Sequence, residues 1–107
     1  MNNLNTIINS IINLNEKEYI KLSKNIEYII LNQIIDEKIL SDTFDSLLSL
    51  VFIDDKRVES LFYKLIQYTS NFNKELSDDY ESIFLEQFKD NELDYLMIKK
   101  LENNKKQ

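Results

Sequence analysis

The sequence contains no cysteine and no histidine. Their absence removes disulfides, thiolate nucleophiles, imidazole bases and the two commonest zinc ligands together. We therefore expect no enzymatic activity, no metal site and no cofactor. A chain without cysteine is compatible with a reducing cytosol, although this absence alone identifies no compartment.

Glycine and proline are also missing, and alanine does not occur, while isoleucine, asparagine and lysine are abundant. Codon choice in an A+T-rich genome explains much of this bias. It still has structural consequences, because tight hairpin turns usually need glycine or proline and asparagine must then supply left-handed residues. The composition favours helices joined by Asn-rich turns.

Long apolar runs are missing as well. The densest run, residues 47–53, contains Ser49 and is far shorter than the roughly 20 residues that cross a bilayer. Residues 1–14 carry no Lys or Arg, so they do not resemble a signal peptide. We expect a soluble, cytoplasmic protein with no membrane segment. Its 107 residues, 43% of them hydrophobic, fit one folded domain spanning residues 1–107.

Helical periodicity runs through the first third of the chain. Apolar residues spaced as one helical stripe are Leu4, Ile7, Ile8, Ile11 and Ile12, with Asn2, Asn5, Asn9 and Asn13 opposite. Residues 13–15 predict a break or kink. Asn15 and Glu18 resemble a capping box that starts a second helix, which ends near Asp36.

The rest of the chain predicts three further helical segments and a short stripe. Ser41 is expected to cap a helix whose residues 44–52 are among the most buried and lie at the centre of the fold. Asp54 or Asp55 is expected to cap the next helix, from Val58 to Phe72. Residues 71–79 are polar and should end that helix. A short stripe at 80–88 and a last helix after Asp90 follow, with residues 103–107 as a frayed tail. The expected fold is an all-α, antiparallel bundle of four to five helices.

Charge is distributed unevenly around the total of -6. Residues 36–59 carry seven acids and three bases, whereas residues 75–95 carry eight acids and one base, a net -7. Residues 96–107 are basic. A solvated loop with the polar faces of two helices is one explanation of the acids. The other is a negative surface that steers and holds a basic protein.

On the second explanation, the partner-binding residues are the acids of this stretch together with a tyrosine. They are Glu75, Asp78, Asp79, Tyr80, Glu81, Glu86, Asp90, Glu92 and Asp94. Tyr80 or Tyr95 would add an apolar anchor beside the charge.

Two other readings of these residues are disfavoured by their chemistry. The adjacent pairs Asp54 with Asp55 and Asp78 with Asp79 lack the spacing of a calcium loop, and helix capping explains them more simply. The six tyrosines are unaccompanied by a basic groove, so we expect no direct binding of nucleic acid.

Three stretches resemble the immunity proteins of the colicin D type, a four-helix family that includes immunity partners of contact-dependent growth inhibition toxins. They are ILSDTF at 39–44, a polar turn starting a helix with an inward Phe, ESLF at 59–62, opening the long helix, and FKDNELDYLMIKKL at 88–101, an acidic cap before a final amphipathic helix. The resemblance implies tight binding of a toxin nuclease domain, with acidic side chains filling the basic cleft that takes tRNA phosphates.

The chain departs from that family in one respect. Family members commonly carry acids near the end of the long helix and in the following loop, but here Gln67, Tyr68 and Asn71 are neutral and the acids begin at Glu75. We therefore place the acidic plug, on charge alone, at residues 75–94.

Three hypotheses of function remain open. The first is an immunity protein that plugs the active site of a tRNase-type toxin. The second is a phage-type acidic inhibitor of a nucleic-acid-guided defence nuclease. The third is a structural protein that self-associates through apolar helix faces, although the sequence does not specifically indicate a homo-oligomer.

Overall fold

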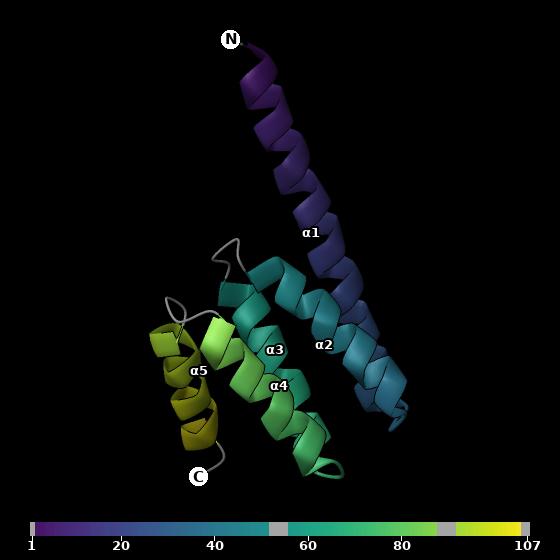
Figure 1. The fold of residues 1–107 in the computed structure, drawn as a ribbon. Helices are drawn as coiled ribbons and strands as arrows, with labels where there is room; N and C mark the ends of the chain where they lie inside the picture. Colours follow the sequence, from purple (N-terminus) through teal and green to yellow (C-terminus); the bar gives the residue numbers. More distant parts are fainter. Residues whose placement is uncertain (1, 52–55, 88–91, 106–107) are drawn as a thin grey trace.

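The computed structural model describes residues 2–51, 56–87 and 92–105, and within these ranges it contains five helices and no strand. The helices are α1 (Asn2–Leu31), α2 (Glu37–Val51), α3 (Lys56–Ser70), α4 (Lys74–Gln87) and α5 (Glu92–Lys105). They pack as a bundle from which the start of α1 projects (Figure 1). The all-α bundle expected from the sequence is confirmed.

Helix α3 is the centre of the bundle, because it packs against each of the other four helices. The apolar residues of α3 from Val58 onward repeat at helical spacing, as predicted. The segment expected to be central was the wrong one, because its described residues, 44–51, lie in α2, beside α3. The reason is that the buried apolar residues of α3 spread over more than one face, so that it packs against several helices at once. Its buried apolar residues are Val58, Leu61, Phe62, Tyr63, Leu65 and Ile66.

Aromatic rings hold the helices to this centre. The Phe62 ring lies with its centroid 5.5 Å from that of Phe44 on α2, 4.8 Å from that of Phe84 on α4 and 6.0 Å from that of Tyr95 on α5. Phe62, Phe44 and Phe84 are completely buried. Phe44 is therefore inward, as the ILSDTF stretch suggested.

Helix α1 runs unbroken for 30 residues, so the break predicted at residues 13–15 is wrong. Its C-terminal half packs on α2 and α3 through buried Leu22, Ile26 and Ile29. Its N-terminal half extends beyond the other helices (Figure 1). Asparagine is only a weak helix breaker, and the helical period on either side prevails over it.

Two helix starts lie earlier than the sequence predicted. The carboxylate of Asp36 accepts the backbone N–H of Ile39 at 3.0 Å and caps α2, five residues before the expected cap at Ser41. The side chain of Asn73 accepts the N–H of Leu76 at 3.1 Å and caps α4. Residues 74–79 are consequently helical and are not part of a loop. Both caps satisfy N–H groups in the first turn that have no partner inside the helix.

The turn between α1 and α2 contains the left-handed residue that closes α1. Gln33 has a φ of 52°, although we expected asparagine in such positions. The neighbouring Asn32 acts differently, because its side chain donates to the carbonyl of Tyr28 at 2.9 Å.

The C-terminal helix is longer than predicted. Because α5 continues to Lys105, residues 103–105 are helical and are not a frayed tail. The expected caps Asp54, Asp55 and Asp90 lie outside the described residues. Across the part of the chain that is described, no helix combines the length and apolar character that a membrane crossing requires.

Candidate functional site

Three of the acids that begin at Glu75 share one side of helix α4. Glu75, Asp79 and Glu86 are separated by four and seven residues, spacings that return to the same face of α4, and all three are exposed. Asp78 is exposed beside them. Because Asn73 caps α4 before these acids, they lie on the helix, and Leu76 and Ser77 in the same first turns are buried.

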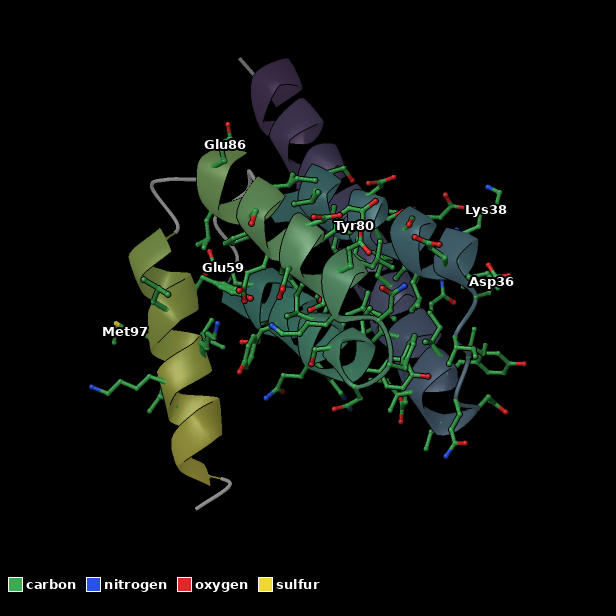
Figure 2. The ribbon with its side chains drawn as sticks, turned by 60° about the horizontal axis from the view of Figure 1, so that its bottom comes forward. Asp36, Lys38, Glu59, Tyr80, Glu86 and Met97 are labelled. Atoms are coloured by element: carbon green, nitrogen blue, oxygen red, sulfur yellow. The ribbon has the colours of Figure 1, made fainter. Side chains whose placement is uncertain are left out.

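Tyr80 fixes the orientation of this face relative to α2. Its ring stacks on that of Phe44, with centroids 4.5 Å apart and planes 15° apart. Its hydroxyl donates to the carboxylate of Asp45 at 2.9 Å and lies 3.3 Å from the carbonyl oxygen of Ser41. Figure 2 shows Tyr80 between α4 and α2. Burial first, and then the bond to Asp45, raises the pKa of the Tyr80 phenol.

This contact brings acids of α2 beside those of α4. Asp42 and Asp45 are exposed on α2, and both raise the pKa of the Tyr80 phenol through their charge. The sequence analysis did not include them among the binding residues. The net -4 of residues 36–59 was the available signal, but that sum did not reveal that the segment lies beside α4. We call these exposed acids of two adjacent helices the acidic face, formed by Asp42, Asp45, Glu75, Asp78, Asp79 and Glu86.

Glu81 lies on the other flank of α4, facing α5. Successive helical residues point about 100° apart, so Asp79 and Glu81 flank Tyr80 on opposite sides. The Glu81 carboxylate accepts the Tyr95 hydroxyl at 2.7 Å and pairs with the Lys99 ammonium at 3.3 Å. Its side chain is 22% exposed. Glu81 is therefore bound to two residues of α5, and it is not part of the acidic face.

Tyr95 is 1% exposed and belongs to the core. The expectation of Tyr95 as a surface anchor is wrong, because its ring packs against Phe62, Tyr63 and Phe84. Burial, followed by the bond to Glu81, raises the pKa of its phenol. Tyr80, by contrast, is half-buried at the edge of the core.

Two lysines offset part of the charge of the acidic face. Lys38 pairs with Asp42 at 3.1 Å and Lys74 pairs with Asp78 at 3.3 Å, both one helical turn apart and well exposed. Such surface pairs are weak. The carboxylates of Glu75, Asp79 and Glu86 make no ion pair with any described residue. Figure 2 shows Glu86 near one end of α4 and Lys38 at the start of α2.

Three other expected binding residues cannot be placed on this face. Asp90 lies outside the described residues, and Glu92 and Asp94 are described only in their backbone, at the start of α5. Glu59, on α3, is 1% exposed and so adds nothing to the surface charge.

A groove of about 580 Å³ lies elsewhere, along α3 between α1 and α5. Its lining comprises Tyr19, Ser23, Arg57, Ser60, Leu61, Tyr63, Lys64, Gln67 and Ile98. At one wall the Arg57 guanidinium binds both carboxylate oxygens of Glu16, at 3.1 and 2.7 Å, and lies 4.4 Å from the centre of the Tyr19 ring. This lining contains no histidine or cysteine. Among the residues described, no group of three or more acidic side chains is arranged to hold a metal ion.

The chain was compared with protein-family models, with curated proteins and with solved structures, and none of them matches it.

Proposed function

We propose that this protein is a non-catalytic binding module whose acidic face holds a basic surface of another protein. The observation that carries the proposal is that six exposed carboxylates lie on α2 and α4, two helices that Tyr80 joins through Phe44 and Asp45. Among the described residues, Lys38 and Lys74 form ion pairs with two of the six. Carboxylates held on rigid helices present a preorganised negative potential, which favours association with a cationic partner.

Within this class, the partner we favour is the nuclease domain of a tRNase-type toxin, whose phosphate-binding cleft the carboxylates would fill. The chain would then act as an immunity protein in the cytoplasm of the toxin-producing cell. Support comes from the sign of the charge, from the helical fold and from the resemblance of residues 39–44, 59–62 and 88–101 to the colicin D-type immunity proteins. Tyr80, half-buried where α4 meets α2, supplies aromatic area beside the α2 acids.

The test is co-purification with the product of the neighbouring gene, followed by binding measurements on that product. We expect the captured protein to be basic and to cleave RNA, and its cleavage to stop when this chain is added. A phage-type inhibitor predicts instead capture of a nucleic-acid-guided nuclease and a neighbourhood of phage genes.

Two matched double variants test the role of the acidic face. Asp79→Asn with Glu86→Gln should lower the association rate constant several-fold, because steering by charge contributes on the order of 10- to 1000-fold to such rates. Glu18→Gln with Glu27→Gln removes the same charge from exposed positions of α1 and should change the rate little. Equal effects of the two variants would show that total charge matters and that this face does not.

A further inference from the structure

The N-terminal half of α1 is helical although its composition is unfavourable for a helix. Residues 2–15 include six asparagines and four isoleucines, together with Thr6 and Ser10, all poorer helix formers than alanine or leucine. An isolated helix of about 14 residues is marginal in water, and most helical stability in proteins comes from packing of an apolar face. This half extends away from the other helices (Figure 1). The packed half of α1 supplies the helical nucleus, but a surface that covered the apolar stripe of this half would stabilise it further.

The register of α1 identifies the side that needs cover. Positions 4, 8, 11 and 12 precede positions 22, 26, 29 and 30 by eighteen residues, which is five helical turns. Leu22, Ile26 and Ile29 are buried against the bundle and Ile30 is half-buried. The projecting half thus repeats, on the same side of the helix, the apolar pattern that the other half uses to pack on α2 and α3.

The absence of charge in this half of α1 indicates which kind of surface would cover it. Residues 1–15 contain no charged residue, so all the charge of the chain lies in residues 16–107. A strongly charged partner would gain nothing from this segment, whereas an identical neutral and apolar segment complements it. Fourteen helical residues span about 21 Å, more than twice the Debye length of about 8 Å at physiological ionic strength. Antiparallel pairing would therefore keep two acidic bundles at opposite ends, where their repulsion is screened.

We propose that residues 2–15 of α1 pair antiparallel with the same residues of a second copy of this chain. With the two-fold axis near position 8, position 4 of one copy lies opposite position 12 of the other. Such an interface is isologous and closes at a dimer. The proposal is independent of the proposed function, because the acidic face lies on α2 and α4.

The first test measures the mass and the helicity of the full chain during dilution. Light scattering should give a dimer, and circular dichroism should lose helical signal as the dimer dissociates. Ile8→Asp should weaken self-association by at least about 100-fold, since two carboxylates would be buried at the axis. Asn13→Asp adds the same charge on the opposite side of the helix and should leave the dimer intact. A chain that is monomeric at all concentrations with full helicity would overturn the proposal.

Cross-linking tests the direction of pairing. Because the sequence contains no cysteine, a disulfide can form only between the introduced cysteines. Under mild oxidation, Ile8→Cys should form a disulfide dimer, and Leu4→Cys should cross-link with Ile12→Cys but not with itself. Efficient self-cross-linking of Leu4→Cys would contradict antiparallel pairing. The Asp79→Asn with Glu86→Gln variant should still dimerise, which separates a failure here from a failure of the proposed function. If the wild-type chain is monomeric and Ile8→Asp abolishes binding of a basic partner, α1 belongs to that interface and pairing between copies is refuted.

Discussion

Replacing Phe62 with alanine should lower the free energy of unfolding by about 4 kcal/mol. Phe62 is completely buried and its ring joins α3 to rings on α2, α4 and α5. Truncating a buried Phe to Ala costs about 3 to 5 kcal/mol, through lost transfer free energy and the cavity left behind. Aromatic pairs add roughly 0.5 to 1.5 kcal/mol each, and these contributions do not sum fully because the three share one ring.

This loss is a large part of the total, because domains are typically stable by about 5 to 15 kcal/mol. Urea denaturation followed by circular dichroism measures it directly. Phe72→Ala is the control, since Phe72 is 41% exposed in the turn before α4, and it should cost less than about 1 kcal/mol. A loss below about 1.5 kcal/mol for Phe62→Ala, or equal losses for both variants, would refute the placement of α3 at the centre.

Three further predictions concern the ends of helices and the buried phenol. Asp36→Ala should destabilise the fold by about 1 kcal/mol because the first turn of α2 loses its cap, while Asp36→Asn should be nearly neutral, as urea midpoints will show. Gln33→Gly should raise the melting temperature, with a gain of up to about 1 kcal/mol, because glycine adopts the left-handed conformation without strain. The raised pKa of Tyr95 means that the unfolded chain releases this proton above about pH 10 while the folded chain keeps it. Stability should thus fall as the pH rises beyond that value, and Tyr95→Phe should reduce the fall in urea titrations between pH 8 and 11. An unchanged slope would contradict burial of the phenol.

The periodic part of the fold was predictable from the sequence. In α3, Val58, Leu61, Phe62 and Leu65 repeat at helical spacing and lie in the core, as expected. The residue that caps a helix could not be predicted where several candidates lie close together. Asp36 and Ser41 are both good capping residues, and only the observed bond from the Ile39 N–H identifies the one in use.

Polar composition misled the prediction for residues 71–79. These residues resemble a loop by composition, yet Asn73 caps a helix, Lys74 and Asp78 pair one turn apart, and Leu76 and Ser77 pack inward. In this segment tertiary burial outweighs a weak local propensity.

The candidate site was predictable only in part. The sign of the charge and the exposed acids of α4 follow from the sequence, but the neighbouring acids of α2 are some 35 residues away along the chain. The bond from Tyr80 to Asp45, which joins the two helices, depends on how both pack around Phe44. The same packing separates Glu81 from the acidic face, because Tyr95 and Lys99 bind it from α5.

The acidic face as one continuous binding surface is most directly tested by titrating the isotope-labelled protein with a short oligo-arginine peptide and following backbone amide shifts by NMR. We predict that the shifted amides cluster around Asp45, Asp79, Tyr80 and Glu86, and that the shifts disappear when salt screens the charges. Shifts spread evenly over all helices, or concentrated on α1 or α5, would contradict the account.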